Sequence, residues 1–500
     1  MLSFAAGIYG SNPPKKGNKG NNGCVSGVPI VSTYERLAFG GEFGTVGPTT
    51  SQMASVPADT RLHDAAAEVR DRVAYRALLA FTFVLFVRPQ DTIPVLDPLH
   101  LAEVFGTFGI LALGIGRLNR GAPVTKMSLE LVAVLAFGAI MLATAPFSIW
   151  PGGAVGVVTD LFSKVIVVFV LILNTLTTRT RFERFVEVVV LSCCYVGVRA
   201  VLDYAMGLNL VEDGRAQGEG GLFGNPNDMA LNLVAFLPLA VILMLGRQRP
   251  IVRGILAIGA PAIVAAIIFS RSRGGTLGLV AMLVVLLFQL RRVKPRVAVI
   301  VVAVTLFTIP LLPDSFTQRM SSIIHPEEDV TGSREARKRL LREAYQAYLD
   351  HPVFGLGAGQ FLNYNPKERE EVWHQTHNAW LQVASELGTG GLLVFSVIVG
   401  SGFLAGLQAV RVLRRSRPRQ RLKSREPAEV LARRERLQLY ASAVLASLTG
   451  WLVAAMFASV AYYWTLYLVL GLAITLRDIT LREVGEIGEP ARVLRRAEAA

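Results

Sequence analysis

Long, nearly uninterrupted apolar segments recur along this 500-residue chain and limit what it can fold into. Hydrophobic residues make up 52% of the sequence, whereas the charged residues make up only 18%. A soluble chain would carry about a quarter charged residues and would place its apolar residues on periodic faces. An apolar segment of about 20 residues can cross a bilayer as a helix. The sequence therefore excludes an ordinary soluble enzyme and predicts a polytopic membrane protein.

Twelve apolar segments are the predicted transmembrane helices of an all-α fold. They lie at residues 72–88, 101–118, 127–149, 155–176, 184–206, 228–246, 251–270, 274–291, 296–312, 389–410, 438–457 and 460–476. If the N-terminus is inside, the even-numbered connections should be rich in Lys and Arg, because positive charge is retained on the cytoplasmic side. All five of these connections are basic. We therefore expect both termini in the cytoplasm.

The chain outside the spans divides into parts of different composition. Residues 1–70 are rich in Gly, Asn, Pro and Ser, which is typical of a disordered cytoplasmic tail, and they contain no secretory signal. The expected parts are this tail, a membrane domain with nine spans (71–312), a long outside loop (313–388), three further spans (389–480) with a basic inside loop (411–437), and a C-terminal tail (481–500). The net charge of +14 does not indicate nucleic-acid binding, because the basic residues are collected between spans.

Two outside segments carry positive charge against this orientation rule. Arg271 and Arg273 lie between spans seven and eight, before Gly274 and Gly275, which allow a helix or ligand to approach closely. The long loop contains a second cluster: Arg334, Arg337, Lys338, Arg339 and Arg342. Guanidinium groups match phosphate oxygens, so both clusters are candidate sites for a lipid diphosphate. Alternatively, Arg271 and Arg273 only reach the lipid headgroups.

The second cluster begins a segment with helical periodicity. Its apolar residues recur at helical spacing: Leu340, Leu341, Ala344, Ala347 and Tyr348. This pattern predicts an amphipathic helix at the outer membrane boundary. The glycines of 355–359 follow no strand, and they predict a tight reversal rather than a nucleotide-binding loop.

Four of the six histidines lie in the same long loop, and His377 opens the run into span ten. An imidazole exchanges protons near neutral pH, so His377 is a candidate general base. Alternatively, it is a structural residue at the start of a helix. Glu370, His374 and His377 have the spacing of metal ligands on one helical face, but no Asp-x-Asp pair accompanies them, and we expect no metal.

Two pairs of opposite charge stand four residues apart inside predicted spans. They are Asp160 with Lys164, and Arg199 with Asp203. Ionisable residues in a span are costly unless they are paired and face the bundle interior. These pairs are either structural struts or part of an ion route through a transporter. The adjacent residues Cys193 and Cys194 are expected to be packing residues.

Four segments resemble the O-antigen ligase and polymerase superfamily of bacterial envelope glycosyltransferases. They are Gly221–Asp228, Ser270–Gly275, Arg337–Gly359, and His377-Asn378 followed after nine residues by Gly388–Gly391. The resemblance covers residues 70–480. It implies a bacterial inner-membrane glycosyltransferase with a periplasmic active site and no metal or cofactor. Such an enzyme moves a glycan from a polyprenyl (undecaprenyl) diphosphate to an acceptor hydroxyl in lipopolysaccharide or exopolysaccharide biosynthesis.

The resemblance also assigns roles to individual residues. Arg273 and Arg337 match the basic positions that hold the diphosphate, His377 matches the motif histidine, and Arg215 resembles a further arginine loosely. Asn227 and Asn378 are either donors of hydrogen bonds to sugar hydroxyls or helix caps. The implied partners are the lipid-linked glycan, an acceptor glycan, lipid core or protein, membrane lipids, and other envelope polysaccharide assembly proteins.

The sequence is also compatible with other functions. The intact spacing from His377 to Gly388 slightly favours a ligase over a polymerase. A secondary transporter or a flippase for lipid-linked glycan is the alternative from another class, although the two halves of the chain show no convincing internal repeat. A non-catalytic scaffold would leave the outside arginines unexplained.

Overall fold

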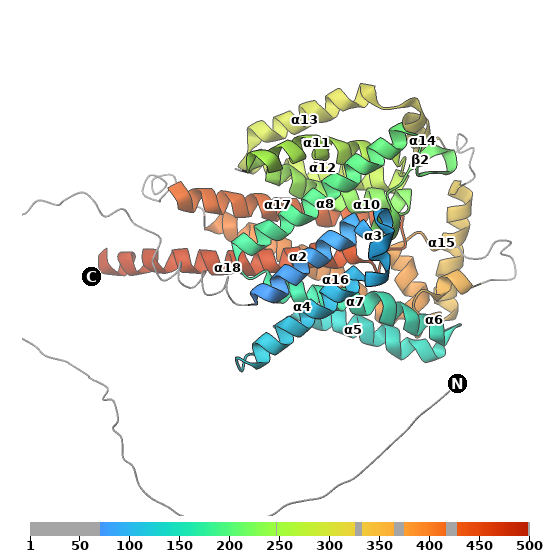
Figure 1. The fold of residues 1–500 in the computed structure, drawn as a ribbon, viewed down its shortest axis with the longest axis horizontal. Coiled ribbons are helices and arrows are strands. Elements are labelled where there is room, and N and C mark those ends of the chain that lie inside the picture. The colour runs from blue at the N-terminus through green and yellow to red at the C-terminus, as the bar shows by residue number, and fades with distance from the viewer. Residues whose placement is uncertain (1–70, 247, 326–332, 365–374, 417–427, 499–500) are drawn as a thin grey trace, which may run out of the picture. The chain divides into compact units, whose positions relative to one another are not determined.

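The computed structural model describes residues 71–246, 248–325, 333–364, 375–416 and 428–498, all within one compact unit that spans 54–500. These residues form long helices that run alongside one another, with one small β-hairpin (Figure 1). The first half contains α2 (Arg72–Val87), α3 (Pro89–Thr92), α4 (Leu101–Leu118), α5 (Leu129–Thr144), α6 (Pro151–Gly156), α7 (Ser163–Thr175), α8 (Arg179–Ala205), β1 (Leu210–Val211), β2 (Arg215–Ala216), α9 (Gly220–Phe223), α10 (Pro226–Leu245) and α11 (Pro250–Phe269). The second half contains α12 (Arg273–Val293), α13 (Pro295–Thr308), α14 (Asp314–Ile324), α15 (Ser333–Asp350), α16 (Ala379–Arg415), α17 (Ala428–Ala455) and α18 (Trp464–Glu498).

The all-α membrane fold predicted from the apolar segments is confirmed. Each predicted span coincides with a helix, and ten helical segments of the described chain are long and apolar enough to cross a bilayer. The helices α2 and α13, with 16 and 14 residues, are shorter than these ten. The count of twelve spans therefore stays a prediction. Residues 1–70 lie outside the described chain.

The centre of the bundle is formed by α10, α17 and α18, whose apolar segments are 78%, 83% and 83% buried. Small residues allow the helices to approach closely around this centre. A methyl group added at Gly278 on α12 would lie 2.8 Å from the Gly450 carbonyl oxygen on α17. In the same way, Gly259 on α11 packs against Cys194 on α8, and the free, buried cysteines are the packing residues that we expected.

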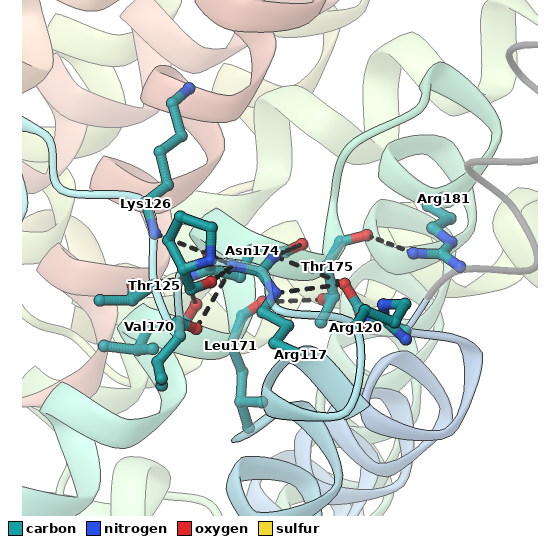
Figure 2. A network of polar contacts seen from close by, with 12 residues as sticks. Arg117, Arg120, Thr125, Lys126, Val170, Leu171, Asn174, Thr175 and Arg181 are labelled. Carbon is teal, nitrogen blue, oxygen red and sulfur yellow. Dashed lines mark hydrogen bonds and ion pairs between the residues drawn. The ribbon is translucent and has the colours of Figure 1, made fainter. Parts of the chain in front are cut away.

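A polar network holds several helices together at the end of the bundle where α4 ends and α5 begins (Figure 2). At its centre is Asn174, only 1% exposed, whose side-chain Oδ1 accepts from Arg117 Nη1 at 2.6 Å and from the Lys126 amide at 3.0 Å. Its amide nitrogen donates to Thr125 Oγ1 and to the Val170 carbonyl, both at 2.8 Å. A buried amide whose donors and acceptors are all used stabilises the junction of α4, α5 and α7.

The predicted charge pairs are confirmed in one case and wrong in the other. Arg199 Nε lies 3.0 Å from Asp203 Oδ1, and a second nitrogen of Arg199 lies 3.0 Å from Glu219 Oε1. Lys164 instead pairs with Glu103 on α4, at 2.6 Å. The reason is local: a π-helical segment from Val157 to Phe162 changes the angular spacing of side chains before Lys164.

At the other end of the bundle, α15 runs across the ends of the long helices, near α14 and β2 (Figure 1). This is the amphipathic helix predicted from the loop sequence. Its apolar face packs on the start of α16 and on the glycine-rich reversal, in a small cluster: Leu340, Ala344, Ala347, Leu356 and Phe361. We refer to this end of the bundle as the α15 end.

The helix α16 is broken near its start, and the glycine-rich reversal and the residues just before it pack against the break. Gly388 has φ +67° and ψ −166°, and a methyl group added there would lie 2.4 Å from the Val353 carbonyl oxygen. In the glycine-rich reversal, Gly355 and Gly357 also have positive φ. A methyl group at Gly355 would lie 2.3 Å from the Glu386 carbonyl carbon. Only glycine fits these positions, so the loop and α16 lock together.

Candidate functional site

Arg215 and Asn227, whose relation the sequence leaves open, are directly bonded at the α15 end. Arg215 Nη2 donates to Asn227 Oδ1 at 2.9 Å, and Ser272 Oγ donates to the same oxygen at 2.9 Å. Arg215 Nε also donates to the Ser270 carbonyl at 2.9 Å. The hairpin of β1 and β2 thus carries Arg215 onto the turn between α11 and α12. The helix-cap alternative for Asn227 is wrong, because Asn225 caps α10.

The same turn gathers the other arginines of this cluster. Arg271, with φ +47°, donates to the Asp213 carbonyl and to the Tyr204 hydroxyl. Arg319 of α14 forms an ion pair with the Asp213 carboxylate at 3.0 Å. Arg273 Nε donates to the Arg319 carbonyl at 3.3 Å. We call Arg215, Arg271, Arg273 and Arg319 the arginine cluster.

The arginine cluster brings four guanidinium groups together at the turn between α11 and α12. Within it, Arg319 pairs with the Asp213 carboxylate, and Arg215, Arg271 and Arg273 donate to backbone carbonyls. Arg273 and Arg215 are half-buried, where the effective dielectric is lower than in water and charge interactions are stronger. The arrangement can therefore bind an anion such as a diphosphate. Sequence reasoning missed Arg319, because nothing in α14 indicates that it reaches the hairpin.

His377 lies in a tight turn just before α16. Its φ is +51°, and its amide donates to Ser459 Oγ at 2.9 Å. Ser459 Oγ also lies 2.8 Å from Thr376 Oγ1. The next residue, Asn378, is the N-cap of α16, and its Oδ1 accepts from the Trp380 and Leu381 amides at 2.9 and 3.0 Å. The helix-cap alternative for Asn378 is thus confirmed.

The short connection between α17 and α18 joins the histidine turn to the arginine cluster. On one side, Asn378 Nδ2 donates to the Met456 carbonyl at 3.2 Å, beside the contact between His377 and Ser459. On the other side, Gly274 packs on Phe457, because a methyl group at Gly274 would lie 2.6 Å from Phe457 Cβ. The residues that follow Arg273 and those around His377 therefore contact the same four-residue stretch, 456–459.

Arg337 lies on the face of α15 that packs toward α16. It stands three residues before Leu340 and seven before Ala344, which are both buried in that contact. Leu381, four residues after His377, packs against the same cluster. The helical face of Arg337 thus points toward the start of α16. The Arg334 backbone lies in the first turn of α15, but its side chain lies outside the described part of the structure.

A buried carboxylate that was not among the predicted site residues supports this region. Glu386, 3% exposed, accepts from the Tyr462 hydroxyl at 2.7 Å and from the Gly359 amide at 2.8 Å. It therefore ties the glycine-rich reversal to α16 and to the residues just before α18. A single acidic residue in an otherwise apolar segment is the signal that could have identified it.

The metal site considered from the sequence cannot be assembled from the described chain. Glu370 and His374 lie outside the described residues. Among the residues that the structure does describe, no three His, Cys, Asp or Glu side chains are grouped as metal ligands.

The fold and site define a polytopic helical membrane protein with a cationic site at the α15 end. Residues 258–396 match the O-antigen ligase family, and this match confirms the resemblance to the O-antigen ligase superfamily. The matched segment contains Arg271, Arg273, Arg337 and His377 but not Arg215. A search of curated proteins finds no match to the chain. The chain is thus a helical membrane protein in which one segment, residues 258–396, is similar to the O-antigen ligase family.

Proposed function

We propose that the chain is a metal-independent glycosyltransferase that moves a glycan from a polyprenyl diphosphate to an acceptor hydroxyl. The active site lies at the α15 end, which faces the periplasm in a bacterial inner membrane. The acceptor belongs to a lipid core or another glycan, and we favour a ligase over a polymerase. The observation that carries the proposal is that the arginine cluster and the turn containing His377 both adjoin residues 456–459. Gly274, next to Arg273, packs on Phe457, and His377 donates to Ser459.

The charge at the two ends of the bundle supports this orientation. Basic residues lie at the connections opposite the α15 end, where Arg117 bonds to Asn174 and Lys294 pairs with Glu435. Connections that stay in the cytoplasm are enriched in Lys and Arg. The α15 end would then face the periplasm, and its arginines are retained there because they bind substrate.

The arginine cluster is suited to the leaving group of this reaction. When the bond between the anomeric carbon and the diphosphate oxygen breaks, its electron pair stays on the lipid diphosphate. Fixed guanidinium groups stabilise this growing negative charge most in the transition state. Arg273 and Arg215 would contact the diphosphate, with Arg337 above it on α15. The lipid tail stays in the bilayer.

His377 would act on the acceptor. As the acceptor oxygen forms its bond to the anomeric carbon, the imidazole takes the hydroxyl proton. The contact with Ser459 fixes the histidine backbone, and Asn378 fixes the direction in which α16 begins. The left-handed φ of His377 turns the chain sharply before the helix and sets the position of the imidazole.

Purified protein in detergent tests the proposal against transport. With a lipid-linked glycan, an acceptor and EDTA, we expect release of polyprenyl diphosphate and formation of a larger product. Arg273→Ala should lower this release about a hundredfold or more. Arg253→Ala is the matched control, because Arg253 is exposed on α11 at the opposite end. Uptake of intact lipid-linked glycan into vesicles without bond cleavage would instead favour a transporter or flippase.

A further inference from the structure

A small polar pocket lies beside the candidate active site. It is bounded by the start of α10 and by the residues that lead into α18, including Asp228, Asn232, Val460, Tyr463 and Thr465. Asp228 directly follows Asn227 of the arginine-cluster contacts. Val460 directly follows Ser459, which holds the histidine turn. The pocket therefore adjoins both the arginine cluster and the turn that contains His377.

Two polar side chains of the pocket wall already have partners. Asn232 Nδ2 donates to the Leu222 carbonyl, and the Thr465 hydroxyl donates to Asn232 Oδ1. These bonds use the Asn232 amide group at both ends and fix it in place.

Asp228 and Tyr463 differ from these neighbours. Neither the Asp228 carboxylate nor the Tyr463 hydroxyl has a hydrogen bond or ion pair with another residue of the described chain, although both side chains are only partly exposed. A phenol hydroxyl is protonated at neutral pH and can donate a hydrogen bond. The pocket therefore presents one acceptor and one donor without partners. Polar groups in such positions normally bond to water or ligand.

The charges around the pocket restrict what it can bind. A phosphate is disfavoured by the Asp228 carboxylate. A cation would satisfy the Asp228 carboxylate but could not accept the hydrogen of the Tyr463 hydroxyl. A neutral hydroxyl group satisfies both partners, since it donates to the carboxylate and accepts from the phenol. The space admits a group about the size of a water molecule.

We infer that Asp228 and Tyr463 bind one hydroxyl group of the donor glycan, on the sugar next to the diphosphate. This inference rests on the proposed function, because the arginine cluster must hold the diphosphate beside the pocket. It adds a recognition site for the donor sugar beside the site proposed for the lipid diphosphate. Binding of the sugar and binding of the diphosphate should therefore be separable.

Binding measurements with two lipids test this separation. One is the polyprenyl-diphosphate-linked glycan, and the other is polyprenyl diphosphate without sugar. We expect Asp228→Asn and Tyr463→Phe each to weaken binding of the glycan-linked lipid about tenfold and to leave the bare lipid unchanged. Arg273→Ala should weaken binding of both lipids. Asp314→Asn is the control, since Asp314 is an exposed acid in the first turn of α14.

The possible results are distinct. Equal weakening of both lipids by Asp228→Asn would overturn the inference, because Asp228 would then act through the fold of α10 or through the arginine cluster. Unchanged binding of the glycan-linked lipid by either variant would overturn it as well. A different result would contradict the proposed function: wild-type protein that binds the donor but releases no polyprenyl diphosphate. Equal melting temperatures of Asp228→Asn and Asp314→Asn exclude a general loss of fold.

Discussion

The His377 amide donates to Ser459 Oγ at 2.9 Å, and this bond ties the candidate base to the connection between α17 and α18. Ser459 is 6% exposed and also contacts Thr376, so it holds both residues of the turn before the helix cap. Two residues earlier, Phe457 packs on Gly274 next to Arg273. A displacement of Ser459 would thus alter the geometry between histidine and arginines.

Ser459→Ala should impair transfer without removing any group that touches substrate. The His377 amide would lose its acceptor, which costs about 1–3 kcal/mol for a buried donor. A small misplacement of a catalytic group lowers the rate, and we expect a loss of about tenfold to a hundredfold in glycan transfer. Ser396→Ala is the control, because that exposed serine bonds only to its own helix. Wild-type rates for Ser459→Ala would show that the bond does not position His377.

His377→Asn should abolish most transfer while the fold is kept. Asparagine tolerates the left-handed φ of +51° but is not a general base, and such a base contributes about a hundredfold or more. His100→Asn is a closely matched control, since His100 is exposed and also left-handed, with φ +42°. The measurement is product formation on a carbohydrate gel. Equal product from both variants would exclude His377 as the base.

Gly388→Ala should detach the loop from α16. The added methyl group would lie 2.4 Å from the Val353 carbonyl oxygen, at a backbone conformation that costs other residues about 1–3 kcal/mol. We expect faster proteolysis within residues 350–361 and loss of transfer. Gly390→Ala is the control, since nothing lies within 4 Å of a methyl group there. Similar proteolysis of the two variants would contradict the role given to the break in α16.

Asn174→Ala should lower stability without a direct effect on the site. It removes two acceptor and two donor contacts at the end of the bundle opposite α15 (Figure 2). Each buried partner left unsatisfied costs about 1–3 kcal/mol, so the melting temperature in detergent should fall clearly. Asn119→Ala, at an exposed helix end, should leave it unchanged. A stable Asn174→Ala variant with no transfer would instead connect this network to catalysis.

Much of the fold follows from local patterns in the sequence. The apolar runs identify the long apolar helices, and the periodicity of Leu340, Ala344 and Ala347 identifies α15 and its buried face. Pro226 at the first helical position indicates Asn225, and not Asn227, as the cap of α10. These features can be predicted from the sequence because each depends on residues only a few positions apart.

Contacts between segments that are distant in the sequence could not be predicted from local patterns. Lys164 pairs with Glu103, 61 residues away, because a π-helical segment rotates the helix before it. Arg319 reaches Asp213 across 106 residues, and Glu386 is bonded to Tyr462 across 76. These pairings depend on which helices are neighbours, and helical periodicity alone does not determine that.

A structure with bound donor tests the central claim most directly, namely that the arginine cluster and His377 act on one substrate. The protein would be studied by electron cryomicroscopy in a lipid nanodisc with a non-reactive polyprenyl-diphosphate-linked glycan. The account predicts the diphosphate within hydrogen-bond distance, about 3 Å, of Arg273 and the first sugar between Arg273 and His377. A diphosphate bound at the opposite end of the bundle, or a sugar out of reach of His377, would contradict it.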